Sequence, residues 1–165
     1  MQTLPPSQLM GIPSGKAGTA ETLRIVRGLV RDYKKSLPIR TTALDIVRGL
    51  NQKDYAGELR AIHRFVRDNI RYVRDIKGVE TVSAPDYTLQ IGQGDCDDKS
   101  VLLASLLESI GHPTRFVAVG YAPNEYAHVL VESRIGAGWL PAETTEPVDV
   151  GWYPENMASR LVIHN

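Results

Sequence analysis

The chain has a single cysteine, Cys96, among its 165 residues. One cysteine excludes an internal disulfide and a zinc site built from several cysteines. An unpaired thiol suits a reducing compartment, so we expect a cytoplasmic protein. The first residues lack the basic segment and the apolar run of a signal peptide, and no apolar run approaches the length that spans a bilayer. We therefore expect no contact with a membrane.

The chain also lacks a net charge, since it has 19 basic and 19 acidic side chains, but its two halves differ. Residues 1–77 carry 15 Lys and Arg against 7 Asp and Glu, whereas residues 78–165 carry 4 against 12. This division favours a fold whose halves complement each other in charge. The alternative is a basic helical face that meets an acidic partner or nucleic acid. Nucleic acid is the weaker alternative, because no aromatic residues interleave with the arginines.

The composition that remains is that of an ordinary globular protein, with 42% hydrophobic and 23% charged residues. Residues 1–18 hold three prolines and three glycines, which predicts an extended N-terminal arm. Several apolar side chains suit this arm to packing on the domain or on a partner in an assembly. Residues 19–165 are predicted to form one domain, with added helices over 19–52 and a core over 53–165.

Two hydrophobic periods divide that domain into helices followed by strands. The helical period predicts helices over about 20–37, 42–50, 54–73 and 96–110, with Pro38 ending the first and Thr42 capping the second. The period of two predicts strands over 115–121, 126–132, 139–143 and 160–163. Residues 75–93 are expected to be an irregular connection. The predicted fold is α+β, with a small antiparallel sheet packed on the helix that carries the cysteine.

That cysteine follows a glycine-rich turn and opens an apolar helix. The free N–H groups of a helix N-terminus favour a thiolate, and Asp95 and Asp98 have the spacing of a capping box. The three acids Asp95, Asp97 and Asp98 oppose the thiolate by their charge. They could also hold a hard cation, but capping and solvation explain them more simply, so we expect neither a metal nor another cofactor. The alternative for Cys96 is a buried, unreactive thiol.

Three further residues complete a candidate catalytic site. His128 lies within a predicted strand that can pack on the cysteine helix, and Glu143 ends the adjacent strand. The order Cys96, His128, Glu143 fits a nucleophile, its base and the group that orients the base. Gln90 is a candidate donor to an oxyanion beside the Cys96 N–H. The alternatives are a structural histidine, a surface acid and a solvated loop amide; His63 is interpreted as a packed or surface histidine.

Several separated blocks of the sequence resemble the transglutaminase-like superfamily. They are Gly94-Asp95-Cys96-Asp97-Asp98-Lys99 with the leucine-rich run after it, Ile110–Arg115, Ala127-His128-Val129, Gly138–Thr145, and the preceding Ala61–Tyr72. The resemblance spans about residues 56–146. Within the superfamily, the sequence is similar in particular to small bacterial and phage-encoded members. It implies a papain-like fold, a Cys-His-Asp triad and acyl transfer through a thioester. Cys96 and His128 match the nucleophile and base, while Glu143 stands where the family has aspartate, with Trp139 and Thr145 matching around it.

The leading hypothesis is a cysteine-dependent acyl-transfer enzyme, a peptidase or amidase rather than a cross-linker, that acts on a protein or peptide substrate. Water is the default acceptor, because nothing in the sequence marks a site for an amine donor. The alternative is a catalytically idle transglutaminase-like module that serves in binding or assembly, for instance in a phage virion. The proline-rich arm, the basic helices and the missing aspartate motivate that alternative.

Overall fold

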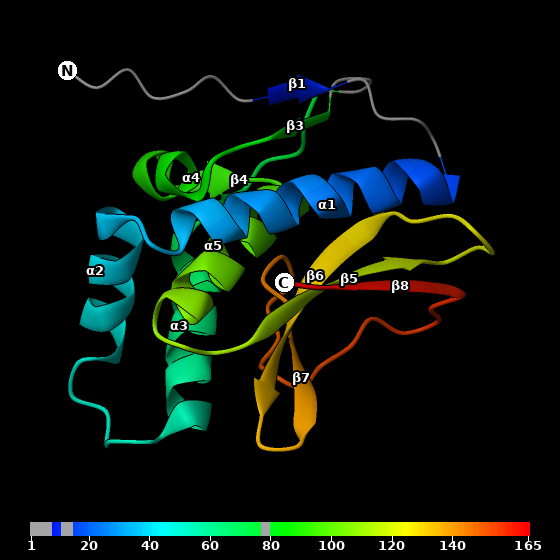
Figure 1. Ribbon diagram of the computed structural model, residues 1–165. Helices are drawn as coiled ribbons and strands as arrows, with labels where there is room; N and C mark the ends of the chain where they lie inside the picture. Colours follow the sequence, from blue (N-terminus) through cyan, green and yellow to red (C-terminus); the bar gives the residue numbers. More distant parts are fainter. Residues whose placement is uncertain (1–7, 11–14, 77–79) are drawn as a thin grey trace.

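The computed structural model describes residues 8–10, 15–76 and 80–165, which form a bundle of helices beside an antiparallel sheet (Figure 1). The helices are α1 (Gly15–Tyr33), α2 (Leu37–Val47), α3 (Tyr55–Asn69), α4 (Pro85–Ile91) and α5 (Cys96–Ser109). The strands are β1 (Gln8–Met10), β2 (Arg71–Tyr72), β3 (Glu80–Val82), β4 (Gln93–Gly94), β5 (Thr114–Gly120), β6 (His128–Ile135), β7 (Gly138–Ala142) and β8 (Ser159–His164). This is the α+β fold that the sequence predicts.

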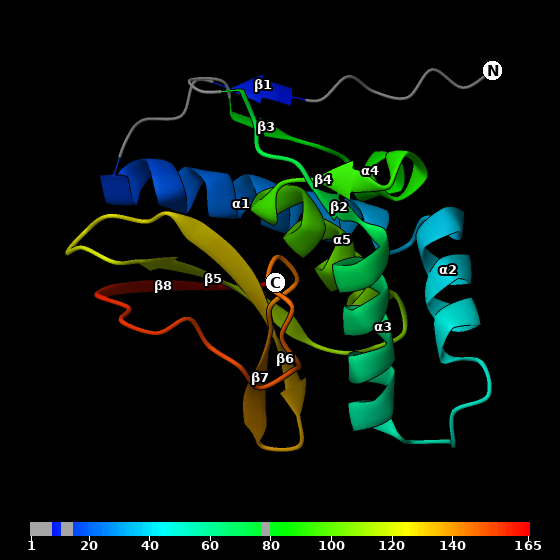
Figure 2. The same ribbon diagram turned by 180° about the vertical axis from the view of Figure 1, so that it is seen from behind.

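Helix α5 is the centre of the molecule. It contacts α1, α2, α3 and α4 as well as strands of the sheet, and the two opposite views show it enclosed between them (Figures 1 and 2). Its apolar residues from Val101 to Leu107 are fully buried. A helix that is apolar on all sides must be covered on all sides, so the other elements fold around it. The helix that carries Cys96 is thereby held rigidly.

The main sheet has four antiparallel strands in the order β7-β6-β5-β8. His128 opens β6, and Glu143 directly follows β7, the neighbour of β6 in the sheet. All four strands were predicted from alternation, with ends shifted by one to three residues. The sheet therefore brings the predicted base and the predicted carboxylate to adjacent strands.

The first two helices differ from the prediction at their ends. Helix α1 begins at Gly15, inside the predicted arm, and ends at Tyr33, whereas α2 begins at Leu37 instead of 42. Pro38 lies in the first turn of α2, and Ser36 caps it by accepting a hydrogen bond from the Ile39 N–H (3.4 Å). Proline is tolerated in a first turn because its missing N–H would have no partner there. Pro38, which was expected to end the first helix, thus lies in the first turn of the second.

The segment over 75–93 is not the irregular connection that was predicted. It contains β3, α4 and β4, and Gly92 caps the C-terminal end of α4 with a left-handed φ of 67° that suits glycine. Helix α3 ends at Asn69 instead of 73, because the chain continues as β2, which pairs in parallel with β4. Within the arm, β1 pairs antiparallel with β3, and the prediction for the rest of residues 1–14 lies outside the described residues. In the described ranges no helix has the length and apolarity to cross a membrane.

Candidate active site

Cys96 is the first residue of α5 and lies within a complete capping box. Asp95 accepts a hydrogen bond from the Asp98 N–H (3.0 Å), and Asp98 accepts one from the Asp95 N–H (3.3 Å). Gly94 allows this tight turn, since a Cβ at that position would lie 2.6 Å from the Cβ of Asp98. The capping predicted from the sequence is therefore confirmed, and it fixes where the thiol emerges.

Three further contacts hold the first turn of α5 in place. The second carboxylate oxygen of Asp98 accepts from the Ser83 N–H (2.7 Å), and Ser100 donates to the Val129 carbonyl of β6 (3.2 Å). Lys99 is buried and donates through Nζ to the Ile70 carbonyl at the end of α3 (2.6 Å). Burial lowers the pKa of Lys99 to about 8. Cys96 is thus positioned against α3, β3 and β6 together.

His128 and Glu143 form a hydrogen-bonded pair. The Nε2 atom of His128 bonds to Oε2 of Glu143, and the other oxygen, Oε1, accepts from both N–H (2.6 Å) and Oγ1 (2.8 Å) of Thr145. Burial raises the pKa of Glu143, but these bonds outweigh it, so the pKa lies below its usual value. An ionised carboxylate only accepts, so Nε2 carries a proton and Nδ1 remains free to accept one. Glutamate therefore makes the contact that the family's aspartate would make.

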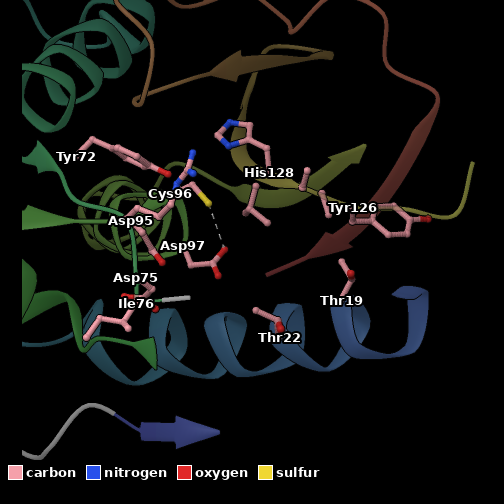
Figure 3. Close-up of a pocket in the computed structure, with 14 residues that line it drawn as sticks. Thr19, Thr22, Tyr72, Asp75, Ile76, Asp95, Cys96, Asp97, Tyr126 and His128 are labelled. Carbon is pink, nitrogen blue, oxygen red and sulfur yellow. Dashed lines mark hydrogen bonds between the residues drawn. The ribbon is translucent and has the colours of Figure 1, made fainter. Parts of the chain in front are cut away.

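Cys96 and His128 line one cavity of about 390 Å³ (Figure 3). Its walls come from α1, the segment after α3, the start of α5, and the strands β5 and β6. The lining residues are Thr19, Thr22, Tyr72, Arg74, Asp75, Ile76, Asp95, Cys96, Asp97, Ala118, Tyr126, Ala127, His128 and Val129. The sulfur lies beside β6, because the Val129 backbone hydrogen-bonds to it. The thiol and the imidazole therefore open onto the same cavity.

Gln90 lies elsewhere than the sequence analysis suggested, whereas His63 is a packed histidine, one of the two interpretations given. Gln90 is exposed near the end of α4 and is absent from the described residues that line the cavity, because that unpredicted helix turns its side chain outward. The structure therefore does not bring the expected oxyanion donor to Cys96. His63 is fully buried, and its Nε2 lies 2.5 Å from the Glu143 carbonyl oxygen. Burial lowers the pKa of His63, so the neutral ring steadies the backbone of Glu143.

Sequence reasoning missed the opposite walls of the cavity. Thr19 and Thr22 come from α1, which lies outside the blocks that resemble the family, and no local pattern marks two helix threonines as cavity residues. Tyr72 and Ile76 had a weak signal, because both are large apolar side chains close to the end of α3. Tyr72 belongs to β2 and Ile76 to the segment after it, and both are exposed.

The electrostatics of the cavity keep Cys96 in its neutral form. Burial raises the pKa of the Cys96 thiol well above its usual value, and the charges of Asp97 and Asp95 raise it further. The hydrogen bond from the Val129 backbone lowers it, but by less. The advantage of a helix N-terminus is therefore outweighed, and the thiol must lose its proton to a base when it reacts.

Replacing Asp97 by asparagine should make the thiol more reactive. Asp97 Oδ1 lies 4.0 Å from Sγ, close enough for its charge to oppose a thiolate. We expect the Asp97→Asn variant to lower the pH midpoint of Cys96 alkylation by iodoacetamide by about one unit. Asp45→Asn, which removes an exposed carboxylate paired with Arg48 on α2, is the matched control. An unchanged midpoint would contradict the role of Asp97.

Comparison with known proteins bears on the family and the fold. The family model described as the Transglutaminase-like superfamily matches residues 40–144. No curated protein matches the sequence. Similar solved structures include a candidate protease from Parabacteroides distasonis (TM-score 0.63, 13% identity, covering 85% of this chain and 31% of that one). Another is a candidate cysteine protease from Cytophaga hutchinsonii (TM-score 0.56, 17% identity, covering 86% of this chain and 52% of that one). A third is LapG from Legionella pneumophila (TM-score 0.53, 20% identity, covering 77% of this chain and 75% of that one).

These likenesses confirm the fold that the sequence predicts. At such low identity they bear on architecture alone. The chain spans about a third and about half of the length of the first two structures, so what those whole proteins do is a separate matter from what this chain does.

Proposed function

Because the chain belongs to the transglutaminase-like superfamily, we propose that it is a cysteine peptidase that acts through a thioester on Cys96. His128 is the base, and Glu143 orients the imidazole. One observation carries the proposal. The cavity that holds Cys96 is also lined by His128, and the Nε2 atom of His128 is hydrogen-bonded to the buried carboxylate of Glu143. The similar structures described as candidate proteases support a cysteine-type enzyme and a peptide or protein substrate.

The catalytic steps follow from the protonation states. As Sγ attacks the substrate carbonyl carbon, Nδ1 of His128 takes the thiol proton, and the imidazolium is stabilised by Glu143. The carbonyl oxygen becomes an oxyanion, which the backbone N–H of Cys96 at the start of α5 can stabilise. The imidazolium then protonates the leaving amine, and a thioester remains. Water, deprotonated by His128, attacks the thioester and releases the acid, and the proton returns to sulfur.

Hydrolysis is favoured over transamidation and over an idle role. Water reaches an open cavity without a dedicated site, whereas transamidation needs a second pocket for an amine. An idle module would have no need to hold Glu143 with three hydrogen bonds while burying it. The assembly role of the arm stays a prediction. Of its described residues, those of β1 pair with β3 of the same chain, and residues 15–18 belong to α1.

Trapping the thioester tests this proposal. The protein is incubated with p-nitrophenyl acetate, and the acetylated peptide is identified by mass spectrometry. We expect an acetyl group on Cys96 that hydroxylamine removes, together with cleavage of an unfolded protein such as casein. The Cys96→Ala variant should show neither. Acetylation confined to lysines, or casein cleavage that survives in Cys96→Ala, would overturn the proposal.

A further inference from the structure

Strand β2 has one free edge beside the candidate active site. Its inner edge pairs with β4, since the Arg71 N–H donates to the Gly92 carbonyl (2.9 Å) and the Val73 N–H to the Gly94 carbonyl (3.0 Å). Because backbone groups alternate along a strand, the N–H and C=O of Tyr72, which lies between these two donors, point the other way. Within the described part of the chain, no backbone hydrogen bond reaches those groups.

This free edge borders the cavity that holds the thiol. Tyr72, Arg74 and Ile76 line the cavity together with Cys96, and Figure 3 shows Tyr72 and Ile76 on the same side of it. Tyr72 is 43% exposed and Ile76 is 81% exposed, so both offer apolar surface to a ligand in the cavity. His128 and Tyr126 lie on the opposite wall. The edge therefore offers unpaired backbone groups and apolar contacts on one side of the nucleophile.

The edge is also held in position before anything binds. Lys99 fixes the Ile70 carbonyl directly before β2, and the Arg71 guanidinium donates to Oε1 of Gln93 on β4 (2.8 Å). The same β4 leads into the capping box of α5. A preformed edge of this kind loses little entropy when a strand is added to it. Its distance to the nucleophile is also set by rigid elements.

We propose that the substrate is an extended, unstructured polypeptide segment that adds to the outer edge of β2 as a further strand. This inference rests on the proposed function and deepens it, because it names the form of substrate that the site takes. Backbone hydrogen bonds to Tyr72 hold the segment, in the manner of β-strand addition, and draw it past Cys96. Small amides, which have too little backbone for these bonds, and helical segments are excluded as good substrates.

Labelling of Cys96 in the wild-type protein tests the backbone contacts. The probe is the thiol alkylator acetyl-trialanine chloromethyl ketone, compared with acetyl-alanine chloromethyl ketone and with three isomers of the tripeptide, each N-methylated at one amide. We expect the tripeptide to label Cys96 about tenfold faster than the single alanine, and one isomer to lose that gain. If the tripeptide is no faster, or if every isomer matches it, the proposal is overturned.

A pair of variants at Tyr72 separates the N–H from the side chain. Proline is tolerated at an outer edge, so Tyr72→Pro removes the outward N–H, whereas Tyr72→Ala removes only the ring. We expect Tyr72→Pro to label with the tripeptide about tenfold more slowly than Tyr72→Ala, once each rate is divided by the rate at which the same variant reacts with iodoacetamide. Equal rates with the tripeptide would overturn the proposal. Failure of the proposed function would show itself separately, as the absence of acetylation of Cys96 by p-nitrophenyl acetate.

Discussion

Replacement of His128 by alanine should reduce kcat/KM for peptide cleavage by about 10³-fold or more. The thiol of Cys96 rests in its neutral form because burial and nearby acids raise its pKa, so the reaction depends on a base at the moment of attack. With His128 gone, the described residues that line the cavity include no other imidazole. The measurement is the steady-state rate with an unfolded protein substrate. His164→Ala, an exposed histidine on β8, is the control and should keep full activity.

The effect of Glu143 should depend on His128. Glu143→Gln cannot stabilise the imidazolium, so we expect a loss of about 10²-fold in kcat with little change in KM. Because the two residues act as one unit, the double variant His128→Ala/Glu143→Gln should be no slower than His128→Ala alone. Losses that multiply in the double variant would show that Glu143 acts independently and would contradict the triad.

The cysteine helix and the sheet could be predicted because their signals are local. A cap, a glycine turn and an apolar run define α5, and alternation with turn residues defines β5 to β8. His128 and Glu143 were found by chain order, since neighbouring strands of a hairpin place their ends together. These features depend on interactions between residues near one another in sequence.

The segment between α3 and α5 could not be predicted, because its structure depends on distant partners. Strands β2 and β4 have two residues each and exist only as a pair, so neither has a periodic pattern. The short helix α4 packs on α5, and that packing outweighs its weak local signal. Gln90 was assigned to the site by its distance in sequence from Cys96, and the intervening helix cancels that argument.

The division of the domain into added helices before residue 53 and a core after it stays a prediction. The residues that line the cavity bear on where that boundary lies. Thr19 and Thr22 of α1 form part of the wall opposite β6, although α1 precedes the matched residues 40–144. A helix that lines the site is part of the unit that would do the chemistry. We therefore propose that α1 belongs to the catalytic unit and is not an addition to it.

Replacement of Glu132 by alanine should lower the free energy of unfolding by about 3 kcal/mol, as for the loss of one member of a buried ion pair. Glu132 of β6 is fully buried and accepts hydrogen bonds from Arg115 (2.5 Å), Arg160 (2.7 Å) and Tyr153. Loss of the Glu132 carboxylate leaves these three donors without their acceptor. The site lies beneath the segment that follows β7. Urea unfolding measures the change, and Glu146→Ala, an exposed acid in that segment, should change the stability by less than about 0.5 kcal/mol.

The pH dependence of unfolding identifies the charge of Glu132 as the cause. Burial raises the pKa of Glu132, but the hydrogen bonds from its three donors outweigh the effect of burial, so the pKa of Glu132 in the folded protein lies below its usual value. Below about pH 4.5 the unfolded chain therefore binds a proton that the folded chain does not, and stability falls as pH falls towards the folded pKa. Glu132→Gln keeps the shape but cannot titrate. The stability gap between wild type and Glu132→Gln should thus be full near neutral pH and shrink below pH 4.5; a gap that is constant with pH would instead assign the loss to packing.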